Sequence, residues 1–194
     1  MKQFNEDVFN SDWAEFWKNM TECGLAEHFV EEKLKNNMKT APALLNEDSG
    51  VAYPGGLLRH IVLFTAISKK ISKMIGGAVE VNNNSLLKVC CLQHLSKLVM
   101  FTKNTNDWEV TNRGLNYKFS ELKGRLKSGE RSILIANDKN IKLTPEEFEA
   151  IRSCDKDNED QSAKNFDCIL SVIVRCANEL TYNIEKIQYK RQKQ

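Results

Sequence analysis

The segment GGLLRHIVLFTAISKKISKMI, residues 55–75, is the most regular stretch of this chain. Its apolar residues recur three or four positions apart, which is the spacing of one face of an α-helix. Gly76-Gly77 follows the segment and favours the end of a helix there. His60 lies beside the apolar face. The pattern therefore predicts a long helix over residues 55–75 with His60 at the edge of its buried side.

A second apolar stretch begins after the asparagines at 82–84. These residues and Ser85 favour a helix start, and the helix expected over about 85–98 is apolar nearly all round, which is typical of burial on most sides. His94 lies within it. Two histidines on two buried helices can meet in a core and share a metal ion. A hydrolytic metal site of that kind needs a carboxylate beside the second histidine, where this chain has Leu95.

Helical patterns also cover both ends of the chain. Residues 11–34 predict two short helices separated at Gly24, the first capped by Ser11 or Asp12. Residues 163–188 predict one long helix. Its expected inward face consists of Phe166, Ile169, Leu170, Ile173, Cys176 or Ala177, Leu180, Ile184 and Ile187.

Between these ends, the regularity is weaker. Thr144-Pro145-Glu146-Glu147 predicts a helix start, with a threonine cap, proline at the first helical position and acids in the first turn. A short helix is expected over residues 133–137. The alternation of residues 108–111 and 115–119 predicts a short hairpin. The fold class expected is all-α, a helical bundle with a small irregular or β-hairpin insert near residues 105–120.

Length and composition restrict the class of protein. A chain of 194 residues suggests one domain: N-terminal helices (1–34) packed on a main unit (35–188), followed by a short basic tail (189–194). The net charge of +2 is too small to require a nucleic-acid partner, and none is expected. The six cysteines form no C-x-x-C pair. Residues 1–7 lack the apolar core of a signal peptide, and no apolar run approaches membrane-spanning length. A reduced, cytoplasmic protein without a membrane is expected.

Six segments carry a resemblance to a known family. They are Thr40–Ala43 (TAPA), Ala52–His60 (AYPGGLLRH), Leu92–Lys97 (LQHLSK), Ser128–Ser132 (SGERS), Leu143–Arg152 (LTPEEFEAIR) and Cys176–Leu180 (CANEL). In this order they resemble the HD-domain metal-dependent phosphohydrolase superfamily, in a subgroup of bacterial and prophage type. The resemblance covers about residues 35–185 and implies a helical bundle that holds one or two divalent metals. In such enzymes the metal activates a water molecule that attacks a phosphoester.

The departures from the family pattern concern the implied metal ligands. His60 and His94 match two ligand positions, but the aspartate of the His-Asp pair is Leu95 and the distant aspartate is Asn178. Two auxiliary histidines of the subgroup correspond to Ser128 and Cys154, again without a match. Every anionic ligand is missing, and neutral imidazoles alone bind hard divalent ions weakly. We therefore expect a degenerate site without catalytic residues or a bound metal.

A rearranged site remains open as an alternative. Cys154 and Glu179 are candidates to join the two histidines, although Glu179 is one residue from the Asn178 position, about 100° away around a helix. Only such a rearrangement would hold a divalent cofactor (Mn, Mg, Fe or Ni). The simpler interpretation of His60 and His94 is a pair of core histidines, hydrogen-bonded to each other or to the backbone.

Three basic residues suggest a pocket for an anion in place of a metal site. Lys97 corresponds to a family lysine that approaches phosphate, and Arg131 and Lys127 are candidates to converge with it as an anion pocket; ordinary surface cations are the alternative. The function expected is a catalytically inactive HD-domain-like protein that acts as a binding or regulatory module. Its expected ligand is a nucleotide or phosphate-containing molecule, and a protein partner is possible. An active phosphohydrolase or nuclease, and a structural or oligomerising protein, are the alternatives; the oligomeric state is unknown.

Overall fold

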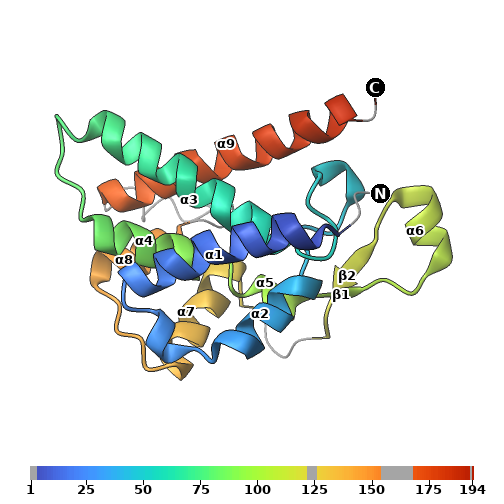
Figure 1. The fold of residues 1–194 in the computed structure, drawn as a ribbon, viewed down its shortest axis with the longest axis horizontal. Coiled ribbons are helices and arrows are strands. Elements are labelled where there is room, and N and C mark those ends of the chain that lie inside the picture. Colours follow the sequence, from blue (N-terminus) through green and yellow to red (C-terminus); the bar gives the residue numbers. More distant parts are fainter. Residues whose placement is uncertain (1–3, 122–125, 154–167, 193) are drawn as a thin grey trace.

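The computed structural model describes residues 4–121, 126–153, 168–192 and 194. Its elements are α1 (Glu6–Glu22), η1 (Ala26–His28), α2 (Glu31–Thr40), η2 (Glu47–Ser49), α3 (Gly56–Ile75), α4 (Asn83–Leu92), α5 (Lys97–Met100), β1 (Phe101–Lys103), α6 (Asp107–Arg113), β2 (Tyr117–Phe119), α7 (Ser128–Asp138), α8 (Pro145–Arg152) and α9 (Ile169–Gln192). The expected all-α fold with a small hairpin is confirmed (Figure 1).

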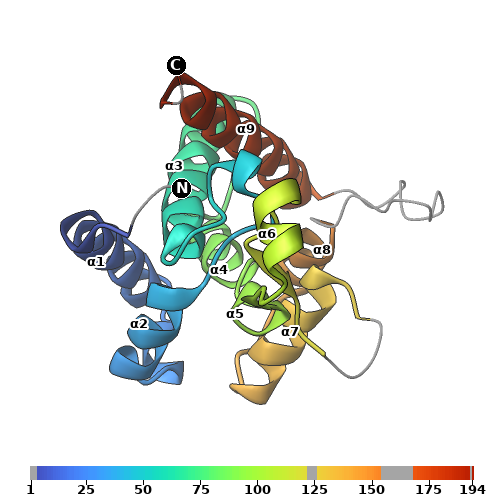
Figure 2. The ribbon, with the colours of Figure 1, turned by 90° about the vertical axis from the view of Figure 1, so that its right-hand side faces the viewer.

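The helices surround α4, which contacts α1, α3, α7 and α8. α3 and α9 pack against each other along one edge of the molecule, as both ribbon views show (Figures 1 and 2). In the second view, α1 and α2 lie on one side of α4 and α7 on the other (Figure 2). The buried apolar residues of these helices form one continuous core. Within the described residues, no helix is long and apolar enough to cross a membrane.

Helix α3 runs over the residues expected from its pattern. It begins at Gly56, directly after Gly55 in the left-handed conformation (φ 82°). A side chain at Gly56 would collide with the carbonyl oxygen of Val51, so the helix start lies directly against the preceding segment. The backbone N–H of Leu57 donates to the carbonyl of Ala41 at 3.1 Å. These contacts fix the rotation of α3 about its axis, and therefore the direction of His60 one turn later.

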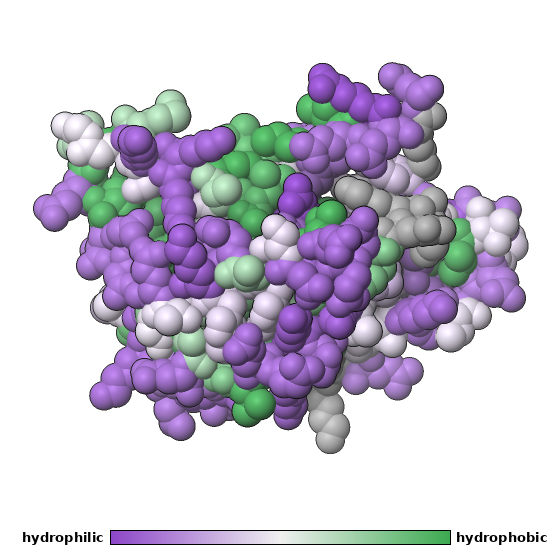
Figure 3. All heavy atoms as spheres, in the orientation of Figure 1, coloured by the Kyte–Doolittle hydropathy of each residue, from purple (hydrophilic) through white to green (hydrophobic). Residues whose placement is uncertain are grey.

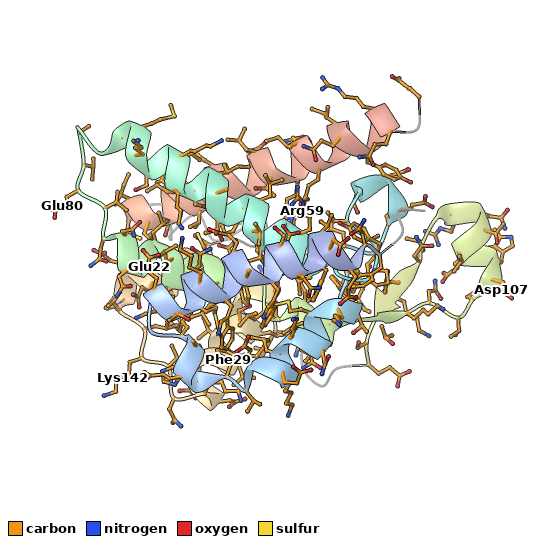
Figure 4. All side chains as sticks on the ribbon, viewed as in Figure 1. Glu22, Phe29, Arg59, Glu80, Asp107 and Lys142 are labelled. Carbon is orange, nitrogen blue, oxygen red and sulfur yellow. The ribbon has the colours of Figure 1, made fainter. Side chains whose placement is uncertain are left out.

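The first helix begins earlier than expected. α1 starts at Glu6, and its cap is Asn5, whose Oδ1 accepts the backbone N–H of Val8 at 3.0 Å. Asp12, expected as a possible cap, lies inside the helix and binds Arg59 of α3, with Oδ1 2.8 Å from Nη1. Figure 4 shows Arg59 where α3 passes α1. After Gly24, a single turn (26–28) and α2 (31–40) replace the one helix expected to begin at Leu25.

The apolar stretch around His94 is not one continuous helix. α4 ends at Leu92, and α5 begins at Lys97. Between them, the backbone N–H of Ser96 donates to Oγ of Ser132, and the Ser132 hydroxyl donates to the carbonyl of Gln93, at 3.2 and 2.8 Å. These contacts come from α7, so the local apolar pattern could not reveal the turn.

The hairpin is present but uses a different first strand. β1 pairs with β2 in antiparallel register, with Phe101 opposite Phe119. The strand expected over residues 108–111 was wrong, because this segment lies in α6. The side chain of Asn106 caps that helix by accepting the backbone N–H groups of Trp108 and Glu109 at 3.1 and 3.3 Å. A local cap therefore outweighs the strand preference of the aromatic and β-branched residues.

The inward face of α9 is more polar than expected. Buried positions of the helix are Leu170, Ser171, Ile173, Val174, Ala177, Asn178, Thr181, Glu185 and Tyr189. Leu180 and Ile187, expected inward, are 47% and 50% exposed. Figure 3 shows hydrophobic surface where α9 passes over α3. α9 also continues to Gln192, so residues 189–192 extend the helix rather than forming a tail.

Candidate functional site

Two histidines meet in the interior, one from α3 and one from the turn after α4. The ring centroids of His60 and His94 are 4.6 Å apart, and the rings are steeply inclined at 70°. His60 is fully buried and His94 is 3% exposed. The ring of Phe64 lies 5.1 Å from that of His94 and covers it from the next turn of α3. The structure therefore brings together the two histidines singled out in the sequence.

A buried carboxylate from α9 accompanies them. Both oxygens of Glu185 lie at hydrogen-bond distance from Nδ1 of His60, at 3.0 and 2.9 Å. Tyr182, one turn earlier on α9, places its ring 4.6 Å from the His60 ring. Sequence reasoning missed Glu185. The available signal was its spacing, because Asn178, Tyr182 and Glu185 follow one face of a helix.

The environment keeps both imidazoles neutral at neutral pH. Burial lowers the pKa of His60, although the nearby Glu185 carboxylate opposes that shift. Burial, followed by the positive charge of Lys97 and by the neighbouring His60 ring, lowers the pKa of His94 well below its usual range. With its Nδ1–H donated to Glu185, His60 has an unprotonated Nε2. The second nitrogen of this ring is therefore a hydrogen-bond acceptor.

Lys97 lies next to the same cluster. It is 6% exposed, and its Nζ donates to the hydroxyl of Tyr182 at 2.7 Å. Arg131 uses Nε to donate to the carbonyl of Leu126 at 3.1 Å. The two cations of the expected anion pocket thus have different partners on different elements. Lys127, the third candidate, is exposed at the start of α7.

Several buried polar groups on these elements have no hydrogen-bond partner among the described residues. They are Nε2 of His60, Nε2 of His94, the side-chain amide of Gln93 and Oδ1 of Asn178. Buried polar atoms are nearly always paired, so each of these groups is unusual. Nε2 of His60 is a hydrogen-bond acceptor that no described residue uses.

The other expected positions are distributed differently. Leu95 is fully buried within the apolar core. The hydroxyl of Ser128 lies 2.8 Å from that of Ser96, and so reaches the turn that carries His94. Glu179 is exposed, on a different side of α9 from Asn178. Cys154 lies outside the described residues.

The donor set does not fit a hard divalent ion. His60 and His94 supply neutral nitrogens, and Asn178 supplies a neutral oxygen, whereas Mg²⁺ and Mn²⁺ require charged oxygen ligands. The carboxylate of Glu185 is bonded to Nδ1 of His60, the nitrogen opposite to the unpaired Nε2. Within the described part of the chain, no three His, Cys, Asp or Glu side chains are grouped to hold a metal ion.

Comparison with known proteins identified no relative. No family model, curated protein or solved structure matches the chain.

Proposed function

We propose that this chain is a catalytically inactive HD-domain-like protein that acts as a binding or regulatory module. One observation carries the proposal: His60 and His94 are in ring contact, while the family's aspartate position holds the fully buried Leu95. The order of the resembling segments supports the ancestry, and the missing carboxylates support the loss of hydrolysis. The pair of histidines is then the remainder of a metal centre.

The ligand that this module would take contains phosphate, with a nucleotide as the natural example. Nε2 of His60 is an acceptor for a sugar hydroxyl or for the O–H of a hydrogen phosphate. Lys97 supplies a positive charge next to the same rings, and buried charge attracts an anion more strongly than exposed charge. Arg131 would contribute from α7. A hydroxyl donor is required because neutral imidazoles offer lone pairs to the ligand.

Metal content tests the loss of catalysis. Purified protein should contain no stoichiometric Mn, Fe, Ni or Zn, and should not cleave a generic phosphodiester in added Mn²⁺. Stoichiometric metal that is lost in His94→Ala, together with hydrolysis, would instead establish a rearranged active centre.

Restoring the missing carboxylates tests the ancestry. The double variant Leu95→Asp with Asn178→Asp should bind Mn²⁺ more tightly than the wild type, because it returns two charged oxygen ligands to the histidines. The matched control is Leu92→Asp with Asn183→Asp, which adds the same charges three residues before position 95 and five residues after position 178. Equal Mn²⁺ affinity in both double variants, measured by calorimetry, would show that residues 95 and 178 do not border the histidine site.

Ligand titration tests the binding role. Orthophosphate and adenosine monophosphate should shift the imidazole proton resonances of His60 and His94, and Lys97→Met should weaken this effect. Lys103→Met, an exposed lysine of β1, is the control and should leave it unchanged. Resonances that do not move with either ligand would favour a structural role for the protein.

A further inference from the structure

A cavity lies between the start of α1 and the start of α3. Its volume is about 380 Å³, within the range of small-molecule sites in proteins. Its walls are mostly apolar, and they are formed by Phe4, Val8, Phe9, Tyr53 and Pro54. Asp12 of α1 and Arg59 of α3 add two charged groups to the same walls. An apolar cavity with a few convergent polar groups is the usual form of a ligand site.

Packing holds the aromatic walls of the cavity in place. The rings of Phe4 and Phe9 are 5.4 Å apart and inclined at 49°. Gly55 lies against both rings, because a Cβ added there would be 3.2 Å from the Phe4 ring and 3.3 Å from the Phe9 ring. Phe9 is 4% exposed, whereas Val8 is 47% exposed, so the cavity is open to solvent beside Val8. The walls therefore suit a ligand with a flat apolar body.

Arg59 supplies a positive charge to the wall of this cavity. Its Nη1 donates to Oδ1 of Asp12 at 2.8 Å, where α3 passes α1 (Figure 4). This is the single hydrogen bond that the described residues give to the guanidinium, which has five N–H donors. The Arg59 side chain is 47% exposed and that of Asp12 is 8% exposed. Asp12 therefore anchors one end of the guanidinium, and the other donors can bind an acceptor in the cavity.

Tyr53 contributes a neutral hydroxyl to the same walls. Burial raises the pKa of Tyr53 to about 12. The positive charge of Arg59 opposes this shift, and the carboxylates of Asp12 and Glu185 add to it. The phenol is therefore uncharged at neutral pH. Among the residues that line the cavity, Asp12 and Arg59 carry the charges, so the cavity presents one cation that one carboxylate partly balances.

We propose that this cavity binds a small aromatic monocarboxylate, whose ring packs against Phe4 and Phe9 and whose carboxylate accepts hydrogen bonds from Arg59. The planar fork of a guanidinium matches the two oxygens of a carboxylate. A second negative charge on the ligand would be repelled by Asp12, which is bonded to the same guanidinium. The site uses no residue of the histidine cluster, and it is independent of the function proposed for that cluster.

Calorimetric titration of the full chain tests this assignment. The probes are benzoate, phenylacetate and indoleacetate, of which at least one should bind at millimolar concentration and shift the backbone amide resonances of Val8 and Gly55. Phenethyl alcohol has the ring of phenylacetate without its charge and should bind about tenfold more weakly. Phenyl phosphate, which carries a second charge, should also bind more weakly than phenylacetate.

Three results of these titrations would overturn the proposal. The first is an absence of binding by all three acids. The second is a set of resonance shifts that excludes Val8 and Gly55, which would place the ligand elsewhere. The third is an affinity for phenethyl alcohol or phenyl phosphate equal to or above that for phenylacetate, which would contradict the selection of a single negative charge.

Two variants separate the apolar walls from the cation. Val8→Trp places a large side chain at the exposed wall and should abolish binding, whereas Ala14→Trp, at an exposed position of α1 outside the cavity, should leave it unchanged. Arg59→Lys keeps a positive charge beside Asp12 but loses the planar fork, and it should weaken phenylacetate binding about tenfold.

The alcohol supplies the matched control for the cation, because its affinity should not change in Arg59→Lys. Circular dichroism confirms the helical fold of each variant before titration. Unchanged phenylacetate affinity in folded Val8→Trp would contradict the location of the site. Unchanged affinity in folded Arg59→Lys would contradict the guanidinium contact. The resonance shifts of the wild-type protein decide the location even if a variant does not fold.

Discussion

Two buried glutamates of this protein have opposite surroundings. Glu147 of α8 is 1% exposed, and its Oε2 accepts from the backbone N–H of Thr144 at 2.9 Å and from Nζ of Lys88 at 3.1 Å. Glu185 of α9 is 5% exposed, and it contacts His60, whose second nitrogen has no hydrogen-bond partner among the described residues. The carboxylate of Glu147 is paired with a lysine. The carboxylate of Glu185 is bonded to a neutral imidazole whose other nitrogen no described residue contacts by a hydrogen bond.

The difference separates a network of reciprocal hydrogen bonds from one that the described residues leave incomplete. Thr144 and Glu147 form two reciprocal hydrogen bonds. The carboxylate of Glu147 accepts the Thr144 N–H at 2.9 Å, and the hydroxyl of Thr144 accepts the Glu147 N–H at 3.2 Å. That arrangement stabilises a helix start and holds α8 to α4. Around Glu185 the bonds orient an imidazole and leave its Nε2 free to accept.

The largest effect is expected at the complete network. Glu147→Ala should lower the free energy of unfolding by about 3 kcal/mol, because it leaves the partly buried Lys88 without its counter-charge and the N–H of Thr144 without its acceptor. Urea denaturation measures this loss. Glu146→Ala, at the exposed neighbouring position, is the control and should stay within about 0.5 kcal/mol of the wild type. Equal losses in Glu147→Ala and Glu146→Ala would show that the contacts of Glu147 add no stability beyond those of an exposed glutamate.

Low pH should destabilise the folded protein through His60 and His94. Burial lowers the pKa of His60 and His94 in the folded state, while unfolded histidine titrates near 6.5. Below that pH the unfolded chain binds protons that the folded chain does not. The free energy of unfolding should therefore fall as pH drops from about 6.5 toward the folded pKa values, by about 1.4 kcal/mol per pH unit for each histidine.

Denaturation between pH 5 and 8 measures this slope. The double variant His60→Gln with His94→Gln should lose it, whereas His28→Gln should keep it. A slope that persists without His60 and His94 would assign the acid sensitivity to other groups.

A smaller loss is expected from the helix cap of the complete network. Thr144→Ala removes the acceptor of the Glu147 N–H and should lower the free energy of unfolding by about 1 kcal/mol. Thr105→Ala, in an exposed loop, serves as the control in the same thermal and urea measurements. An unchanged Thr144→Ala protein would mean that Lys88 alone accounts for the stability at Glu147.

The smallest effect is expected at Glu185 itself. Glu185→Gln keeps an oxygen that accepts from Nδ1 of a neutral His60, so the loss at pH 7 should be below about 1 kcal/mol. Glu147→Gln is the matched comparison and should lose more, because there the negative charge faces a lysine. The opposite ranking in urea denaturation would show that His60 is charged in the folded protein.

The sequence predicted what depends on local pattern. The spacing of apolar residues in 55–75 was sufficient for α3, and Thr144-Pro145-Glu146-Glu147 was sufficient for the start of α8, because their bonds lie within a few residues. His60 and His94 were recognised as partners from their place on apolar stretches. Residues 108–111 were misassigned, since the cap at Asn106 outweighed the strand preference of the segment.

Features that depend on distant contacts could not be predicted in this way. The turn at 93–96 is held by Ser132 of α7, which an apolar pattern does not indicate. The rotation of α9 was misjudged because Leu180 and Ile187 were expected to be buried, and that error also concealed Glu185. A single buried carboxylate interrupts hydrophobic periodicity, and periodicity is the signal on which such assignments rest.

The bond between His60 and Glu185 also has a consequence for the order of assembly. Its partners are 125 residues apart, so it cannot form before the chain has been synthesised as far as Glu185. Contacts of such long range are made late and slow the approach to the native state. Until α9 docks on α3, the imidazole of His60 faces water and titrates as an ordinary histidine. The histidine cluster is therefore complete only after α9 has been synthesised and has docked on α3.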